Sequence, residues 1–223
     1  MELNQEFMEQ VRPVAIANLV RVGSRHDGGY VLPASSLTQT DYLISLGYGN
    51  NFDFERDYLK SGKGKTVMLF ESSITFQYLF SALYQDCKRF LLRKRAFPLY
   101  RLKTLILFIR MTITPRLTYV NKKVVGNRNV APQKEITLKE ILHTQSKSLR
   151  GLLKMDIEGA EFECLESTIE SQQIFDLVSL VIEFHDIQKR TDDFLNLIHK
   201  LKSGFQIVNT HFNNFAEIRD GLP

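Results

Sequence analysis

One stretch in the second half of the chain constrains the fold more than any other. A mainly apolar run, Leu152–Met155, ends at Asp156, and Gly159 permits a tight turn before the helix-forming segment Ala160–Leu165. This order predicts a buried strand followed by a loop that carries Asp156 and Glu158. Because ligands of open α/β sheets bind outside the carboxyl ends of the strands, two carboxylates in this loop favour a chemical role. A surface turn with solvated acids is the alternative interpretation.

A second strand and turn occur nearer the start of the chain. Tyr42–Leu46 has the length and composition of a buried strand, a turn with two glycines follows, and Phe52–Tyr58 has a helical pattern. Glycines let a ligand approach the backbone because they have no Cβ. The complete dinucleotide fingerprint and the phosphate-loop Lys-Ser/Thr pair are missing, which fits a ligand without pyrophosphate, such as S-adenosylmethionine. Gly47, Gly49 and Asn50 are therefore predicted to bind the methionine end of this cofactor.

The next predicted strand, Thr66–Glu71, also ends in an acid. In nucleoside-binding α/β sheets, an acid about twenty residues after the glycine turn accepts hydrogen bonds from the ribose hydroxyls. Glu71 follows Gly49 at nearly that spacing. Glu71 is therefore the predicted ribose ligand, with an ordinary surface acid as the alternative.

Further segments continue the alternation of strands and helices. The remaining expected strands are Thr118–Asn121, Lys123–Gly126, Val178–His185 and Phe205–Phe212. The remaining expected helices are Glu2–Val20 (bent or ended at Pro13), Ser73–Ala82, Ile136–Leu142 with a Thr137–Glu140 capping box, and Asp192–Lys202. The alternation predicts an α/β protein with a doubly wound, mostly parallel sheet, in a single domain over residues 1–223.

Residues 154–161, Lys-Met-Asp-Ile-Glu-Gly-Ala-Glu, resemble the KxDxEGAE signature of the FkbM-type methyltransferases. Segments 21–32, 44–50 and 211–214 resemble the wider pattern of that family and follow in the expected order. The resemblance implies the class I methyltransferase fold, which is Rossmann-like, with S-adenosylmethionine as the cofactor. It adds Asp27 and Tyr30 as secondary cofactor-site candidates around the hairpin turn Asp27-Gly28-Gly29. Class I sheets usually end in a hairpin of strands six and seven, and we expect this sheet to lack its last strand.

The charge of the chain is unevenly distributed. The net charge is +4, yet no Asp or Glu occurs from Cys87 to Lys134, the basic insert at about 87–134. Its 13 basic residues leave 16 basic against 25 acidic residues elsewhere. They are Lys88, Arg89, Arg93, Lys94, Arg95, Arg101, Lys103, Arg110, Arg116, Lys122, Lys123, Arg128 and Lys134. Such a concentration of positive charge indicates an anionic partner.

Three interpretations of the basic insert stay open. It could be a helical elaboration whose cations are simply solvated. It could be a surface that docks on anionic lipid near a glycolipid or lipid-linked substrate. A nucleic-acid patch ranks last, because the Phe and Tyr residues do not form a recognisable RNA-binding motif.

Acidic and histidine side chains at the predicted strand ends are the candidates for catalysis. A hydroxyl acceptor loses its proton as it attacks a methyl group, and Asp156, Glu158 or His185 could accept that proton, with His211 as a weaker candidate. The same Asp156, Glu158 and His185 could instead hold a divalent cation, since carboxylates and imidazole suit Mg²⁺ or Mn²⁺. The spacing does not decide between a base and a metal. His185 could also be structural, and Asn213–Asn214 could contact the acceptor or form a simple turn.

The predicted function is that of an S-adenosylmethionine-dependent O-methyltransferase acting on a hydroxyl of a sugar, glycan or other small acceptor. Two alternatives stay open: a nucleic-acid methyltransferase that uses the basic insert, and a non-catalytic binding protein that keeps the fold. The chain has no run of about 18 apolar residues, no secretory signal at its start, and two cysteines without metal spacing. We expect a cytoplasmic protein with reduced thiols, and the insert offers peripheral contact with the inner face of the membrane.

Overall fold

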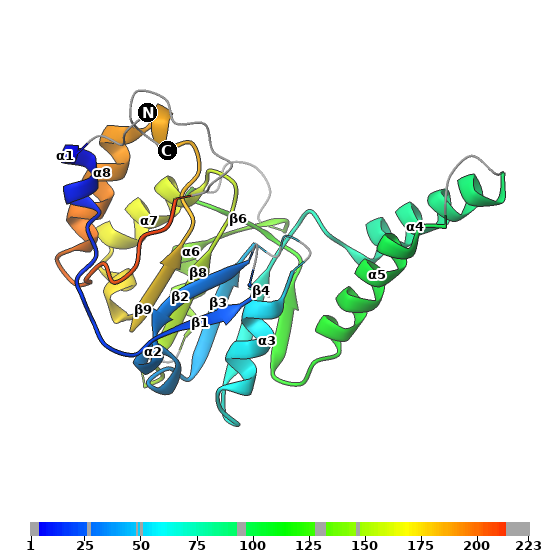
Figure 1. Cartoon of the computed structure of the whole chain (residues 1–223), viewed down its shortest axis with the longest axis horizontal. Coiled ribbons are helices and arrows are strands. Elements are labelled where there is room, and N and C mark those ends of the chain that lie inside the picture. Colours follow the sequence, from blue (N-terminus) through cyan, green and yellow to red (C-terminus); the bar gives the residue numbers. More distant parts are fainter. Residues whose placement is uncertain are drawn as a thin grey trace.

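The structure is a computed structural model that describes residues 5–25, 28–47, 49, 51–92, 97–127, 133–145 and 148–212. Its centre is a parallel sheet with the strand order β5-β4-β3-β8-β9 (Figure 1). These strands are β3 (Tyr42–Leu46), β4 (Thr66–Phe70), β5 (Leu117–Val120), β8 (Gly151–Met155) and β9 (Ser179–Ile182). The doubly wound, parallel sheet expected from the sequence is therefore confirmed. Within the described residues, no strand follows β9 in this sheet.

Two small sheets and a set of helices complete the fold. β1 (Leu19–Gly23) and β2 (Gly29–Pro33) form an antiparallel hairpin, whereas β6 (Lys123–Val125) and β7 (Glu135–Thr137) pair in parallel. The helices are α1 (Gln5–Gln10), α2 (Ala34–Thr38), α3 (Asp53–Lys60), α4 (Phe76–Leu91), α5 (Leu99–Thr112), α6 (Leu138–His143), α7 (Glu161–Glu170) and α8 (Thr191–Leu201). Short 3₁₀ helices are η1 (Gln173–Asp176) and η2 (Ile187–Lys189).

Each face of the central sheet packs against its own hydrophobic core. Successive side chains of a strand point to opposite faces, so Leu43 and Leu152 enter one core while Ile44 and Leu153 enter the other. The β1–β2 hairpin, α3, the start of α4 and the second half of α5 supply the first core, and α1, α6, α7 and α8 supply the second. Burial on both faces explains why these strands appear in the sequence as nearly continuous apolar runs.

The capping box predicted for the helix near residue 137 is present. Thr137 Oγ1 accepts a hydrogen bond from the Glu140 amide at 3.2 Å, and Glu140 Oε2 accepts one from the Thr137 amide at 2.9 Å. The helix itself begins at Leu138, because residues 135–137 extend as β7. The expected strand Lys123–Gly126 is also real, but it pairs with β7 instead of joining the central sheet.

The helix expected over Glu2–Val20 is much shorter in the structure. The described part is helical over Gln5–Gln10, which lies ahead of Pro13, and Leu19 already belongs to β1. Phe7 is buried against α8, where its ring stacks with that of Phe194 at 5.5 Å between centroids. The first half of the expected helix therefore anchors the chain, and the second half was wrongly assigned.

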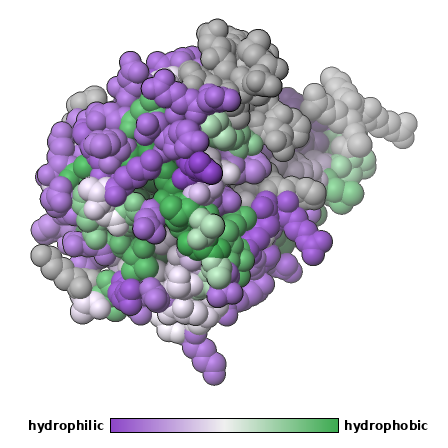
Figure 2. Space-filling model, turned by 60° about the vertical axis from the view of Figure 1, so that its left-hand side comes forward, coloured by the Kyte–Doolittle hydropathy of each residue, from purple (hydrophilic) through white to green (hydrophobic). Residues whose placement is uncertain are grey.

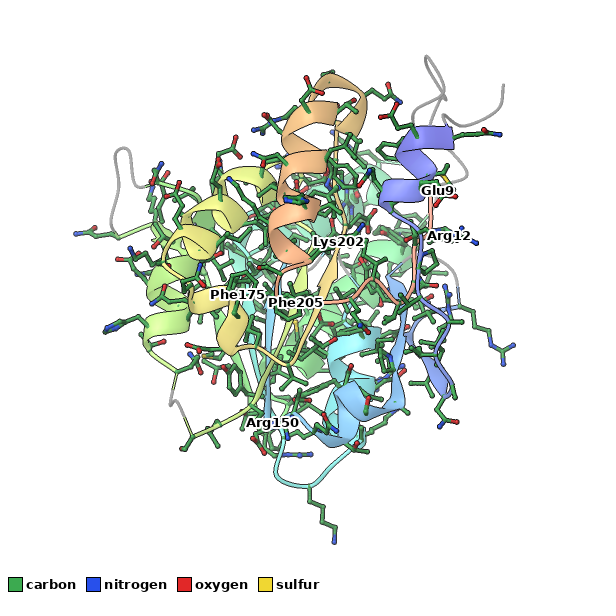
Figure 3. The ribbon with its side chains drawn as sticks, turned by 90° about the vertical axis from the view of Figure 1, so that its left-hand side faces the viewer. Glu9, Arg12, Arg150, Phe175, Lys202 and Phe205 are labelled. Carbon is green, nitrogen blue, oxygen red and sulfur yellow. The ribbon has the colours of Figure 1, made fainter. Side chains whose placement is uncertain are left out.

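The strand expected over Phe205–Phe212 is wrong. This segment does not pair with β9; its Ile207 carbonyl accepts a hydrogen bond from the Val14 amide at 2.8 Å. Phe205 stacks on Phe175 of η1 with ring centroids 5.7 Å apart, as the sticks of Figure 3 show. Phe212 lies against Phe7 of α1, with ring centroids 6.3 Å apart, so the apolar residues of the segment reflect burial without strand pairing.

Helices α4 and α5 form a hairpin that projects away from the sheet, to the right in Figure 1. We call the described residues between 76 and 113 the arm. Thr75 caps its first helix by accepting a hydrogen bond from the Tyr78 amide at 3.1 Å. No helix in the described part of the chain is both long and apolar enough to cross a membrane.

Candidate active site

Four neighbouring strands end at the same edge of the sheet and carry the predicted site residues there. The ladder continues just past the strand ends: the Asp156 amide donates to the Leu46 carbonyl at 2.9 Å, and the Glu183 amide donates to the Met155 carbonyl at 2.9 Å. The chain leaves β3 toward β4 on one side, and β8 lies on the other side. This reversal is the topological switch point at which open α/β sheets bind ligands.

Gly47 lies at the centre of this edge and needs to be glycine. Its φ is +87°, and a Cβ at this position would lie 1.7 Å from the Asp156 carbonyl oxygen. Gly49 also has a positive φ, +54°, but a Cβ there would meet no atom within 4 Å. The turn after β3 thus packs tightly on the loop after β8 at Gly47 and leaves open space beside Gly49.

Replacing Gly47 with alanine is expected to lower the free energy of unfolding by about 3 kcal/mol or more, because the methyl group meets backbone and the φ is unfavourable. For a domain of this size, that loss corresponds to a midpoint roughly 6–12 °C lower in a thermal melt followed by circular dichroism. Gly64→Ala is the matched control, since a Cβ at Gly64 meets nothing within 4 Å. Equal midpoints for the two variants would contradict the close approach of Gly47 to Asp156.

Lys154 holds the Gly47 turn in place from inside the sheet. Its side chain is buried near the carboxyl end of β8, and its ammonium donates to the Gly47 carbonyl at 2.7 Å. The same ammonium lies 6.0 Å from the centre of the Tyr30 ring, and the Tyr30 hydroxyl donates to Glu183 Oε2 at 2.9 Å. No role for Lys154 was predicted from the sequence, although a charged residue inside an apolar strand is a signal of one.

Glu71 follows β4 directly and lies beside the Gly47 turn, since the Gly47 amide donates to the Phe70 carbonyl at 3.0 Å. Glu71 Oε1 accepts hydrogen bonds from the amide and hydroxyl of Ser73, at 2.6 and 2.7 Å. The Tyr119 hydroxyl donates to the Glu71 carbonyl at 3.2 Å and fixes the backbone of this loop. Glu71 is half-buried, and these hydrogen bonds orient it at the place where the sequence predicted a ribose ligand.

Asp156, Glu158 and His185 come together on the other side of the switch point. His185 Nε2 lies 3.8 Å from Asp156 Oδ1 and 3.6 Å from Glu158 Oε2. One ligand atom from each residue falls within 4.8 Å of the others, a spacing that can hold a metal ion. The convergence of these three predicted residues follows from the pairing of β8 with β9. Glu158 is mostly exposed, so the group opens to solvent.

Glu161 contacts His185 from the interior of the protein. It is fully buried, and its Oε1 accepts hydrogen bonds from the Ile157 and Gly159 amides, both at 3.1 Å, and lies 3.0 Å from His185 Nδ1. Its Oε2 is buried and has no hydrogen-bond partner among the described residues. Burial acts to raise the pKa of Glu161, but the bonds from His185 and the two amides lower it overall. Glu161 belongs to the motif at residues 154–161, but its sequence position alone predicted no role for it.

The protonation of His185 follows from this contact. The hydrogen bond to Glu161 is the main cause that raises the pKa of His185 to about 9, against the opposing effect of burial, and the charges of Glu161, Glu158 and Asp156 add to it. At neutral pH the imidazole is therefore a cation, and a protonated imidazole cannot accept another proton. As long as no metal replaces that proton, Asp156 is a better candidate base than His185.

The remaining predicted residues are either elsewhere or outside the described part. His211 is exposed and does not belong to the group of Asp156, Glu158 and His185. Asp27, Asn50 and the pair Asn213–Asn214 lie outside the described residues.

Both cysteines are unpaired. Cys164 is buried in α7, and burial is the main cause that raises the pKa of its thiol to about 12. It therefore stays a neutral thiol and takes no part in this edge of the sheet.

Comparison with known proteins gives one informative result. No curated protein and no solved structure shows a significant match. The family model described as the methyltransferase FkbM domain matches residues 47–219, which begins at the Gly47 turn and includes the whole 154–161 motif. The match spans well over half of the chain. It agrees with the strand order of the central sheet and includes the switch-point residues described above. The chain therefore belongs to the FkbM methyltransferase domain family.

Proposed function

We propose that the protein is an S-adenosylmethionine-dependent O-methyltransferase that acts on a hydroxyl of a sugar, glycan or other small acceptor. One observation carries the proposal: the Gly47 turn and Glu71 lie on one side of the switch point, and Asp156, Glu158 and His185 lie on the other. A methyl donor and a hydroxyl acceptor need such adjoining sites at one sheet edge.

The residues on the Gly47 side fit S-adenosylmethionine. The open space beside Gly49 admits a ligand close to the backbone, and the Glu71 carboxylate suits the two ribose hydroxyls. Gly47, Gly49 and Asn50 are proposed to contact the methionine end of the cofactor. The bound cofactor supplies an electrophilic methyl group on a sulfonium. The protein contributes orientation, through the turn that Lys154 fixes.

The residues on the opposite side of the switch point from Gly47 fit a divalent cation that would bind the acceptor hydroxyl. Asp156, Glu158 and His185 Nε2 offer three ligand atoms. Histidines that bind metals commonly donate their other ring N–H to a carboxylate, and Glu161 lies at that place beside Nδ1. A cation held there would favour loss of the hydroxyl proton. Without one, Asp156 is the group placed to take that proton.

The first experiment is calorimetric titration of the whole chain with S-adenosylmethionine and, separately, with NADH. We expect binding of the first and none of the second. A Gly49→Asn variant sharpens the test, because asparagine tolerates a positive φ yet fills the open space beside the turn. Its thermal midpoint should stay within about 3 °C of the wild type, while its affinity for S-adenosylmethionine falls at least roughly tenfold, the effect of about 1.4 kcal/mol.

Two outcomes would count against the proposal. Absence of S-adenosylmethionine binding by the folded wild type would favour a non-catalytic relative that keeps the fold. Binding of NADH in its place would indicate an oxidoreductase.

A cytoplasmic location is part of the proposal, and the two unpaired thiols support it.

A further inference from the structure

The arm exposes most of the large hydrophobic side chains that the described part of the chain leaves at its surface. Of 16 such side chains, 13 lie in the arm: Phe76, Tyr78, Phe80, Tyr84, Phe90, Leu91, Leu92, Phe97, Leu99, Tyr100, Ile106, Ile109 and Ile113. Leu91 and Leu99, at the facing ends of the two helices, are 77% and 69% exposed. Hydrophobic side chains are also visible at the distant right-hand end of the molecule in Figure 2.

Helix α5 is apolar on two sides, and only one of them is covered. Its buried side chains are Thr104, Leu105, Phe108 and Met111, which pack toward the body of the protein. Its exposed aliphatic side chains are Leu99, Ile106 and Ile109, spaced seven and three residues apart and continued by Ile113 just beyond the helix. Residues with this spacing share one helix face. The uncovered stripe is too long and too apolar to be explained as a few scattered surface residues.

Positive charge borders this stripe. Lys103 and Arg110 lie three residues before and four residues after Ile106, so all three share one face of α5, and both cations are exposed. The acid nearest the insert, Asp86, is already paired with Arg89 at 3.2 Å and Arg101 at 3.4 Å. The sequence from Cys87 to Lys134 supplies no further acid. The arm therefore joins an apolar surface to a positive charge that nothing within it neutralises.

We propose that the arm docks on an anionic membrane surface, with its exposed apolar side chains in the acyl boundary and its cations at the lipid headgroups. Helices that combine an apolar face with bordering Lys and Arg bind in the plane of such a surface. Anionic headgroups attract each cation that lies close to them. Because α4 starts five residues after Glu71, the arm leaves the body at the edge that holds the candidate active site. Docking therefore keeps that edge near the membrane.

Charge and chemistry disfavour two other occupants. A second copy docked arm to arm would bring two uncompensated cationic surfaces together, and like charges at close range repel. Nucleic acid would satisfy the cations and could stack on the aromatic rings, but it would leave Leu91, Leu99 and Ile106 in water. An anionic lipid surface satisfies both the cations and the aliphatic side chains.

The test is flotation of the whole chain with vesicles of 70% phosphatidylcholine and 30% phosphatidylserine, against vesicles of phosphatidylcholine alone. The wild type should bind the anionic vesicles at least about tenfold more tightly, and 0.5 M salt should reduce that binding, because the attraction is screened. Lys103→Glu/Arg110→Glu should lower the partition coefficient at least about tenfold. Leu99→Ser/Ile106→Ser should lower it by a similar factor at unchanged charge.

The matched control is Lys63→Glu/Lys139→Glu, which makes the same change in net charge at two exposed lysines of the body. It should lower the partition coefficient by less than about threefold. Thermal melts should show that all variants are folded. Equal losses for the control and for the arm charge variant would mean that net charge alone is responsible, and would overturn the proposal. Vesicle binding that is unchanged in both arm variants would also overturn the proposal. A wild type that binds 20-mer RNA but no vesicles would do the same, as would a stable wild-type dimer that the Leu99→Ser/Ile106→Ser substitutions dissociate.

Discussion

Replacing Asp156 with asparagine is expected to weaken Mn²⁺ binding by roughly 100-fold or more. The substitution keeps the size of the side chain but removes one charged ligand from the group with Glu158 and His185. Loss of a residue that merely supports a metal ligand already costs about 10–100-fold in affinity, and loss of a ligand should cost at least as much. Calorimetric titration with MnCl₂ measures the effect, and the affinity for S-adenosylmethionine should change less than about threefold, since the cofactor residues lie across the switch point.

Glu170→Gln is the control for this experiment, because Glu170 is an exposed acid at the end of α7 and does not belong to the site. It should bind Mn²⁺ as the wild type does. Unchanged Mn²⁺ affinity in Asp156→Asn would remove Asp156 from the metal site. If the wild type binds neither Mn²⁺ nor Mg²⁺, the cation is rejected and Asp156 stays as the candidate base, to be judged by loss of methyl transfer in the same variant.

The second large effect is expected at Glu71. Alanine at this position should weaken S-adenosylmethionine binding by roughly 100-fold or more, because two hydrogen bonds from ribose hydroxyls to a carboxylate contribute about 1.5–3 kcal/mol each. The fold should survive, since Glu71 lies in the loop after β4 and is only half-buried. Calorimetry with S-adenosylmethionine measures the cofactor affinity, and a thermal melt measures the stability of the fold.

A pair of controls makes the Glu71 result specific. Glu71→Gln keeps an acceptor oxygen and should lose less affinity than Glu71→Ala, whereas Glu170→Ala should lose none. Mn²⁺ affinity should be unchanged in Glu71→Ala, the reverse of the pattern for Asp156→Asn. If Glu71→Ala binds S-adenosylmethionine as tightly as the wild type does, the assignment of Glu71 to the ribose is wrong, and only the Gly47 turn stays as the proposed cofactor site.

The strands and the edge of the sheet that carries the site could be predicted from the sequence for a clear physical reason. β3, β4 and β8 are buried on both faces, so their residues form short apolar runs that stop at a glycine or an acid. The site residues follow these runs directly, and the carboxyl ends of parallel strands share one edge. The meeting of Asp156 and Glu158 with His185 followed from that rule alone.

The parts that could not be predicted depend on contacts between distant segments. Lys154 is buried beside a carbonyl 107 residues earlier in the chain, and Glu161 meets His185 24 residues later, so local sequence gives neither partner. Phe205–Phe212 is rich in β-branched and aromatic residues, as a strand would be, but Phe205 packs on η1 and Phe212 on Phe7 of α1 without strand pairing. The acceptor, the single domain over residues 1–223 and the membrane contact stay predictions.

The arm also bears on how the central sheet forms. β3 and β8 are neighbours although the flanking residues Asp41 and Arg150, which hydrogen-bond to each other, are 109 residues apart in the chain. Closing a loop costs conformational entropy that grows only with the logarithm of its length. Shortening this loop by the length of the arm would change the closure free energy by only about 0.4 kcal/mol. The arm therefore adds almost no entropic cost to the pairing of the two strands that frame the site. Its length and its exposed face can vary without endangering the sheet, provided that the residues of α4 and α5 that pack in the core are kept.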